Sequence, residues 1–269
     1  MKQTTLGIIG ATGNVGGELV KILSQYDVAI YALTRNTDKI TSQKNKIEAR
    51  FFDFNNIDTC AFENIKKLFW ITPINIGHSQ EEKWLDVLKK STVKHIIQLS
   101  SVNPEIFNLD KSENLIQQSG IPYTILRANT FMQNFNYERN SILNENAFYF
   151  PGGSGKISFI DIRDIAQSVA NILTRDQHNN KIYTLTGNKA LDYYQVANLF
   201  SDVCKKTIKY VDTYQFPEFE TTEQKNNPMR QIFFNAVRNN LFSDIDNSLE
   251  EILGKKSRSF IQYVEDYWS

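Results

Sequence analysis

The sequence has few of the residues that build disulfide frameworks and metal sites. Its two cysteines, Cys60 and Cys204, are too few and too far apart in the 269 residues to form such a framework. We expect both thiols to be buried as small apolar side chains rather than to act as nucleophiles. The three histidines, His78, His95 and His178, do not have the spacing of metal ligands. The sequence therefore predicts no metal site.

An excess of charge of either sign is also lacking. Thirty Lys and Arg residues balance 30 Asp and Glu residues, so the formal net charge is zero. Nucleic-acid phosphates bind to clustered basic side chains, so no nucleic-acid partner is expected. No apolar run approaches the roughly 18 residues that cross a bilayer, which predicts no membrane partner and a cytoplasmic location. The 41% of apolar residues suffices for a large core and excludes a wholly disordered chain.

Short apolar runs alternate with helical patterns over the first 130 residues. A typical helical pattern runs from Ser79 to Lys90, with Trp84, Leu85 and Leu88 on one face. Continuous rather than alternating apolar runs are typical of strands that helices cover on both faces. The order therefore predicts an α/β fold with a doubly wound parallel sheet of the Rossmann type. The expected strands are Leu6–Gly10, Val28–Leu33, Ile47–Phe54, Leu68–Ile71, His95–Leu99 and Tyr123–Leu126.

The pattern changes after Phe150, where a glycine-rich stretch begins. A short apolar run at 157–160, a helix and a further strand at 182–185 follow, and the remainder is mostly helical. We expect residues 1–150 to form a nucleotide-binding core to which residues 157–187 return. Residues 188–269 would form a smaller, mostly helical substrate lobe.

A glycine-rich turn joins the first expected strand to the first helix. Gly10 suits a tight turn, Gly13 lets backbone amides approach a diphosphate, and Gly16 permits close packing of helix on strand. The unpaired amides at the start of the helix favour an anion. Because the turn follows a strand and opens a helix, it predicts a nucleotide site rather than an ordinary turn. The expected contacts are Gly10, Thr12, Gly13, Asn14, Val15 and Gly16.

The second expected strand ends close to Arg35 and Lys39. NAD enzymes usually place Asp or Glu at this strand end, where it accepts a hydrogen bond from the ribose 2′-hydroxyl. A guanidinium can instead bind a 2′-phosphate through two hydrogen bonds. The sequence therefore favours NADP(H) over NAD, the alternative being a solvated surface arginine.

Several sequence motifs, which follow one another along nearly the whole chain, resemble those of the NmrA-like branch of the atypical short-chain dehydrogenases/reductases. They are the Gly10–Gly16 turn, the SGIPYTILR segment at 119–127, FMQN at 131–134, SFIDIRDIA at 158–166 and YTLTG at 183–187. The resemblance implies a Rossmann fold, NADP(H) as cofactor and further cofactor contacts. Asp53 and Phe54 would lie by the adenine, Ile71, Thr72 and Pro73 along the middle of the nucleotide, and Ser100 and Ser101 toward the nicotinamide. From the residues alone, Asp53 would instead be a cap at a strand end.

The tyrosine that donates a proton in short-chain alcohol dehydrogenases has no counterpart at the expected place in this sequence. Short-chain dehydrogenases that act on alcohols use a Tyr four residues before a Lys, which lowers the pKa of the phenol. Here Phe107 stands four residues before Lys111, and a phenyl ring cannot donate a proton. Ser101 precedes Phe107 by fewer residues than that pattern usually has, and Glu113 aligns with the family's basic residue. Lys111 and Ser101 remain candidate catalytic residues; Lys111 is either a ligand of the nicotinamide ribose or a solvated helix residue.

Without the tyrosine, alcohol and sugar-nucleotide epimerase chemistry is not expected. Hydride transfer to a quinone-like or other conjugated electrophile stays feasible, because water can protonate the delocalised product. Relatives in the resembled family include NADPH-dependent quinone reductases, and Phe107, Phe131, Met132 and Asn134 would bind such a planar substrate. The alternative is a non-catalytic NADP(H) sensor with a protein partner. Its candidate surface would be the aromatic tail, Tyr210, Tyr214, Phe216, Phe219, Phe233 and Phe234. The alternative for these residues is that they cover the substrate pocket or the core. A homodimer is possible for either function.

Overall fold

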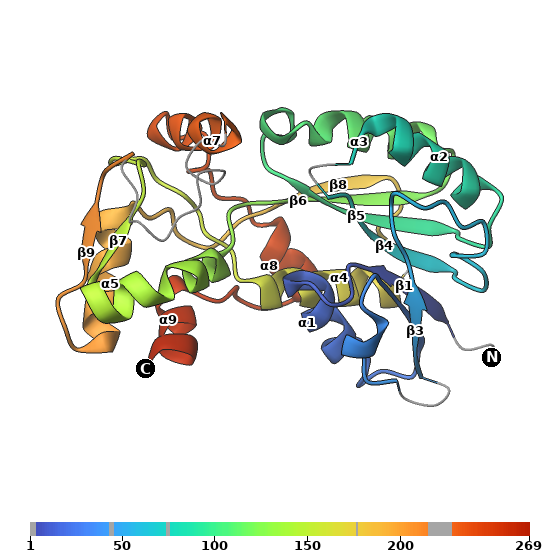
Figure 1. The fold of residues 1–269 in the computed structure, drawn as a ribbon, viewed down its shortest axis with the longest axis horizontal. Helices are drawn as coiled ribbons and strands as arrows, with labels where there is room; N and C mark the ends of the chain where they lie inside the picture. Colours follow the sequence, from blue (N-terminus) through green and yellow to red (C-terminus); the bar gives the residue numbers. More distant parts are fainter. Residues whose placement is uncertain (1–3, 43–45, 74–75, 176, 215–227) are drawn as a thin grey trace. The chain divides into compact units, whose positions relative to one another are not determined.

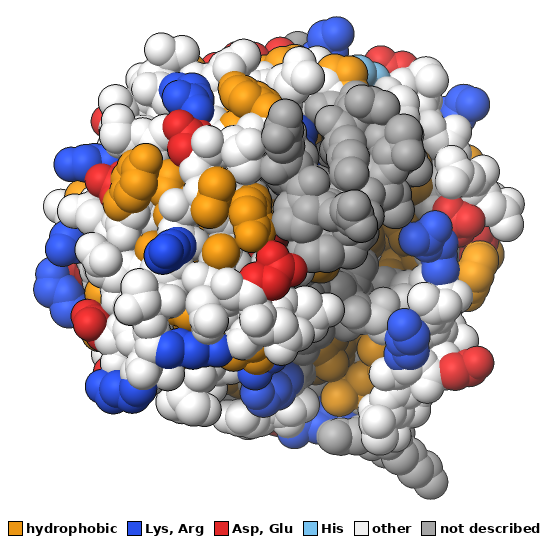
Figure 2. Space-filling view, turned by 60° about the vertical axis from the view of Figure 1, so that its left-hand side comes forward, with side chains coloured by type: hydrophobic (Ala, Val, Ile, Leu, Met, Phe, Trp, Pro, Cys, Tyr) orange, Lys and Arg blue, Asp and Glu red, His pale blue; other side chains and the backbone are white. Residues whose placement is uncertain are grey.

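The computed structural model describes residues 4–42, 46–73, 76–175, 177–214 and 228–269. The chain divides into two compact units. The first unit comprises residues 1–128 and 162–184, and the second comprises residues 129–161 and 185–269. Within the described ranges, no helix combines the length and apolar character that a membrane span requires. On the face drawn in Figure 2, basic and acidic side chains are interspersed rather than gathered by sign.

A seven-stranded sheet forms the centre of the first unit (Figure 1). Its strand order is β3-β2-β1-β4-β5-β6-β8. Each of the neighbouring pairs from β3 to β6 is parallel. The order reverses between β1 and β4, which is where open α/β sheets bind ligands at the carboxyl ends of the strands. The strands are β1 Thr5–Ile9, β2 Ala29–Thr34, β3 Ile47–Phe51, β4 Lys67–Ile71, β5 His95–Ser101, β6 Tyr123–Ala128 and β8 Lys181–Leu185.

Helices cover both faces of this sheet, as Figure 1 shows. Helices α1 (Asn14–Leu23) and α4 (Ile162–Thr174) pack together on one face, and α2 (His78–Lys89) and α3 (Leu109–Gln118) on the other. The central strands β1, β4 and β5 bury residues on both faces, which is why their sequences are largely apolar. The core on the α2 side is aromatic: Phe52, Phe54, Phe62, Trp70 and Trp84 are all at most 5% exposed. The predicted doubly wound parallel sheet is confirmed.

The second unit combines helices with a small parallel sheet. Strands β7 (Ala147–Tyr149) and β9 (Lys209–Val211) pair with each other. A second aromatic cluster surrounds Phe135, whose ring centroid lies 5.4 Å from those of Phe148, Phe200 and Phe260. The predicted helical C-terminal region is confirmed. Its helices are α5 Tyr193–Cys204, α7 Pro228–Arg238, α8 Ser248–Leu253 and α9 Phe260–Trp268.

Short helical turns complete the connections. Two 3-10 turns, η1 (Thr37–Lys39) and η2 (Pro104–Phe107), lie in the first unit. The 3-10 helix η3 (Met132–Glu138) and the π-helical turn η4 (Ser141–Glu145) lie in the second.

The division of the chain differs from the one expected in three places, at residues 129–150, 157–161 and 185–187. Residues 129–150 belong to the second unit, because β7 pairs with β9 and not with the seven-stranded sheet. Residues 157–161 also belong there, since the Ile157 N–H donates to the Leu191 carbonyl (2.9 Å) and the Ser158 N–H to the Phe242 carbonyl (2.9 Å). Only residues 162–184 return to the first unit.

Two local expectations were wrong. The third strand ends at Phe51 and not at Phe54, so Asp53 and Phe54 lie beyond it. Cys60 is exposed and lies in a turn, next to Ala61 and Phe62, which are buried instead. A hydrogen bond with Glu63 is the main cause that raises the pKa of the Cys60 thiol, which works against a nucleophilic role. Cys204 is half-buried.

Candidate functional site

The glycine turn between β1 and α1 has the backbone that its sequence predicts. Gly10 has a φ of 71°, a left-handed conformation that glycine adopts without strain. Its N–H donates to the Leu33 carbonyl (3.1 Å), which fixes the turn against the end of β2. The Gly13 N–H donates to the Gly10 carbonyl (2.8 Å), and α1 begins at the next residue, Asn14. A Cβ at Gly16 would lie 2.2 Å from the Gly10 carbonyl oxygen, so only glycine fits there.

The N-terminus of α1 can receive an anion. Gly13 is the N-cap and has no side chain that could pair with the first amides of the helix. Thr12, Gly13 and Asn14 are exposed, while Val15 is buried beneath the turn. Unpaired amides and the positive end of the helix dipole together favour a phosphate. The backbone thus fits the diphosphate of a dinucleotide.

Two adjacent glycines of α1 provide a matched test of this turn. Gly16→Ala is expected to lower the free energy of unfolding by about 1–3 kcal/mol and to weaken dinucleotide binding, because its methyl group displaces the Gly10 carbonyl. Gly17→Ala is the control, since its Cβ would meet the Ala11 carbonyl oxygen at an ordinary 3.6 Å. Alanine favours helices, so this variant should be neutral or more stable by up to about 1 kcal/mol. Denaturant unfolding compares the two, and equal stabilities would contradict the prediction.

Arg35 lies beside the glycine turn, just beyond β2. The Thr12 and Thr34 hydroxyls are 3.0 Å apart, and the Asn36 N–H donates to the Thr34 hydroxyl (3.1 Å). These contacts connect the turn to the segment that carries Arg35. The Arg35 side chain is exposed and makes no ion pair with another described residue, and Lys39, at the end of η1, is exposed as well.

Asp53 and Phe54 follow β3 and have local structural partners. The Asp53 Oδ1 accepts a hydrogen bond from the Asn55 N–H (3.0 Å). This contact agrees with the alternative interpretation of Asp53 as a cap at the end of a strand. The Phe54 ring is buried, 5.0 Å from the Phe52 ring centroid and 5.4 Å from that of Trp70. Their contact with an adenine stays a prediction.

A pocket of about 280 Å³ lies at the carboxyl end of β4. It brings together four residues that the sequence singled out, Thr72, Pro73, Phe107 and Lys111. Ile71, which ends β4, is half-buried. Phe107 ends η2 and Lys111 lies in the first turn of α3, where its side chain is exposed. The pocket also includes His78, Glu81 and Ser112, which the sequence analysis did not identify.

Both candidate serines have partners within the first unit. Ser100 is buried, and its hydroxyl donates to the Glu113 carboxylate (2.6 Å). The Ser101 hydroxyl donates to the carbonyl of the next residue, Val102 (2.9 Å). Glu113 is 1% exposed and is held in two-point contact by Arg127, whose Nη2 lies 2.6 Å from Oε2. The hydrogen bond with Glu113 raises the pKa of the Arg127 guanidinium. Glu113 is therefore a buried carboxylate that is paired with Arg127.

The remaining predicted substrate residues lie in the second unit. Phe131 bridges to Ile160 and is half-buried, and Asn134 is exposed. Met132 is buried and lines a cavity of about 270 Å³ with Phe159 and Leu191. Phe107 belongs to the first unit, so the expected grouping of all four residues stays a prediction.

The aromatic residues of the predicted tail differ in their exposure. In the aromatic tail, Tyr210 and Phe234 are buried, whereas Tyr214 is exposed. Phe216 and Phe219 lie outside the described residues.

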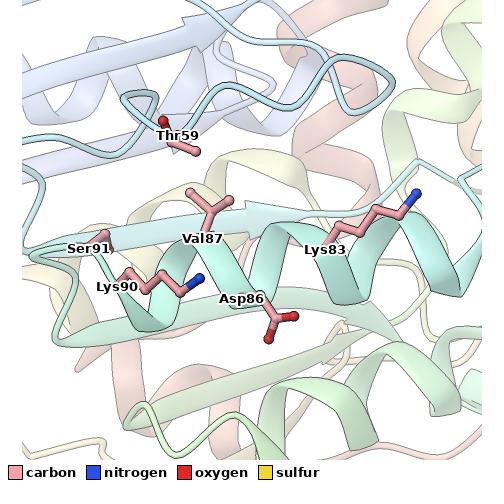
Figure 3. A pocket seen from close by; sticks show the side chains of 6 residues that line it. All are labelled: Thr59, Lys83, Asp86, Val87, Lys90 and Ser91. Carbon is pink, nitrogen blue, oxygen red and sulfur yellow. The ribbon is translucent and has the colours of Figure 1, made fainter.

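A surface hollow of about 300 Å³ along α2 (Figure 3) is lined by none of the predicted site residues. Among the described residues, no group of three or more His, Cys, Asp or Glu side chains could hold a metal ion.

The sheet, its switch point and the glycine turn define an α/β fold of the Rossmann class. The chain belongs to the NmrA-like family, whose model matches residues 2–266. It is 26% identical over 275 residues to the NAD(P)H azoreductase of Xenophilus azovorans, covering 96% of both chains.

The fold is shared with solved structures that hold a dinucleotide. The NADPH complex of the NADPH-dependent quinone oxidoreductase of Escherichia coli matches with a TM-score of 0.84 at 22% identity, over 98% of this chain and all of the other. The transcriptional regulator NmrA in complex with NADP matches with a TM-score of 0.82 at 14% identity, over 100% and 96%. The resemblance found in the sequence is confirmed, and a further relative, quinone oxidoreductase 2 of Escherichia coli, is 27% identical over 223 residues, covering 78% of this chain and 77% of the other.

Proposed function

We propose that this protein is an NADPH-dependent reductase that transfers hydride to a quinone-like or other conjugated electrophile. The observation that carries the proposal is the glycine turn, with its uncapped helix N-terminus, next to the exposed Arg35, which makes no ion pair with any residue that the structure describes. The turn suits the diphosphate, and Arg35 suits a 2′-phosphate. The relatives named as azoreductase and quinone oxidoreductase support the reaction class.

The chain's own side chains favour acceptors that need no strong protein acid. Phe107 stands four residues before Lys111, where the tyrosine of the alcohol-dehydrogenase pattern would stand, and cannot donate a proton. The Ser101 hydroxyl donates to the carbonyl of Val102. NADPH, when bound, would supply the hydride. Addition of hydride to a quinone gives an anion whose charge is delocalised, so water can protonate it. An alkoxide formed from a ketone has no such delocalisation.

The test is the oxidation of NADPH, followed at 340 nm, with a panel of quinones and azo dyes and with NADH in parallel. Acceptor-dependent turnover that prefers NADPH is the expected result. Tight NADPH binding without turnover on any acceptor would contradict the enzyme and favour the second candidate, a redox sensor. That candidate rests on Phe107 in place of the tyrosine and on the structural likeness to NmrA, a transcriptional regulator.

The Phe107→Tyr variant tests the assignment of the missing acid. We expect it to gain no measurable alcohol dehydrogenase activity, because the Ser101 hydroxyl is bonded to Val102 and Glu113 stands where the family has a basic residue. Oxidation of secondary alcohols by NADP⁺ is the measurement, with the wild-type protein as baseline. Robust turnover of an alcohol by the variant would contradict this view of the site.

A further inference from the structure

A buried carboxylate lies beneath the pocket at the end of β4. The Glu81 side chain, in the first turn of α2, is fully buried. Its Oε1 accepts hydrogen bonds from the Thr72 hydroxyl (2.7 Å), from the indole N–H of Trp70 (3.2 Å) and from the Ser112 hydroxyl. Three donors thus converge on one carboxylate oxygen and fix the orientation of the group.

The other carboxylate oxygen is left without a donor. Among the described residues, neither Glu81 Oε2 nor His78 Nδ1 has a hydrogen-bond partner, although both atoms are buried. They lie 3.9 Å apart, which is too far for a hydrogen bond between them. One hydroxyl oxygen could hydrogen-bond to both at roughly 2.8 Å each. Buried polar atoms are rarely left unpaired, so the arrangement indicates a ligand group that supplies a donor.

The charge of the pocket limits what that group can be. Glu81 and the exposed Lys111 are its charged residues, together with the ionisable His78. The carboxylate is buried and poorly screened, whereas Lys111 extends into water, so a second anion such as phosphate would be repelled at Oε2. Hydroxyl groups fit instead, because a carboxylate readily accepts hydrogen bonds from a ribose.

The strand order places this pocket along the path of a dinucleotide. At the carboxyl edge the successive positions are Arg35 after β2, the glycine turn after β1, and Thr72 after β4. A Cβ at Gly10 would lie only 3.2 Å from the Ile71 side chain, so the glycine turn adjoins the end of β4. A dinucleotide with its 2′-phosphate at Arg35 and its diphosphate at the turn would carry its second ribose toward the pocket.

We propose that Glu81 and His78 bind the hydroxyl groups of the nicotinamide-side ribose, with Thr72 and Ser112 holding the carboxylate in place. The inference rests on the proposed NADPH function. It assigns to α2 the recognition of the reactive half of the cofactor, whereas Arg35 recognises the other half.

The experiment compares two ligands on the full chain by calorimetric titration. NADPH carries both ribose groups, while adenosine 2′,5′-bisphosphate carries the 2′-phosphate but lacks the nicotinamide half. Glu81→Gln should weaken NADPH binding at least about tenfold, because it removes a charge-assisted hydrogen bond, and should leave bisphosphate binding within about twofold. Glu82→Gln is the matched control: it removes the same charge from the next, exposed residue of α2 and should change neither affinity.

A second variant keeps the test decisive if Glu81→Gln does not fold. The side chain of His78 is 34% exposed, so His78→Ala does not disrupt the core, and it should weaken NADPH about two- to tenfold with the bisphosphate unchanged. Equal weakening of both ligands, or no change for NADPH, would overturn the inference while leaving the proposed function intact. Failure of the wild-type protein to bind either ligand would overturn both.

Discussion

Replacing Trp84 with alanine is expected to lower the free energy of unfolding by about 3–5 kcal/mol. The indole is fully buried in the aromatic core on the α2 side, 4.7 Å from the Phe52 ring centroid and 5.5 Å from that of Phe62. Its N–H donates to the Phe54 carbonyl (2.9 Å). Truncation would leave a large cavity in a closely packed core, and neighbouring rings can fill it only in part.

Thermal unfolding followed by circular dichroism measures this effect. A loss of this size corresponds to a fall of roughly 6–20 °C in the midpoint for a chain of this length. Trp84→Phe is the matched control, since it keeps a ring in the cluster and Gln80 still donates to the Phe54 carbonyl. Its cost should be smaller, about 1–2 kcal/mol. A midpoint for Trp84→Ala within 2 °C or so of the wild type would show that the indole is not part of the core.

Replacing Arg35 with alanine is expected to weaken NADPH binding by about 10- to 150-fold and to leave NADH binding nearly unchanged. The range corresponds to a hydrogen bond with a charged group, about 1.5–3 kcal/mol. NADH lacks the 2′-phosphate, so the substitution removes no hydrogen bond between Arg35 and this cofactor. Because Arg35 makes no ion pair with another described residue, its removal leaves no carboxylate unpaired.

Titration of both cofactors against wild type and variant gives the selectivity directly. Lys21→Ala is the control for a general loss of positive charge, since Lys21 is exposed in the last turn of α1, at the other end from the glycine turn. It should change both affinities by less than about twofold, given the screening of exposed charges. Small, equal losses for NADPH and NADH in Arg35→Ala would contradict the 2′-phosphate assignment.

Local signals predicted the sheet well. Most strands of the sheet are short, largely apolar segments, and six of the seven expected strands agree with the structure to within about two residues. The exception is the third, because Phe52 and Phe54 are apolar and buried in the aromatic core but lie beyond the end of β3. An apolar run reports burial and does not by itself report strand pairing.

Glu81 shows why part of the candidate site was missed. It has helical spacing with Trp84, Leu85 and Leu88, so the sequence does place it on the buried face of α2. An acidic residue on an apolar face is a signal for a buried polar partner, but the sequence does not say which partner. The donors come from Thr72 on the preceding segment and from Ser112, 31 positions away on α3.

The sequence by itself determined the class of fold, the glycine turn, the family and the place of Arg35, because each depends on residues that are close together along the chain. Only the tertiary structure decided which side chains share the pocket at the end of β4 and that residues 129–150 belong to the second unit. It also decided that Glu113 is buried against Arg127. These features depend on packing between segments far apart in the sequence, and such packing leaves no periodic trace along the chain.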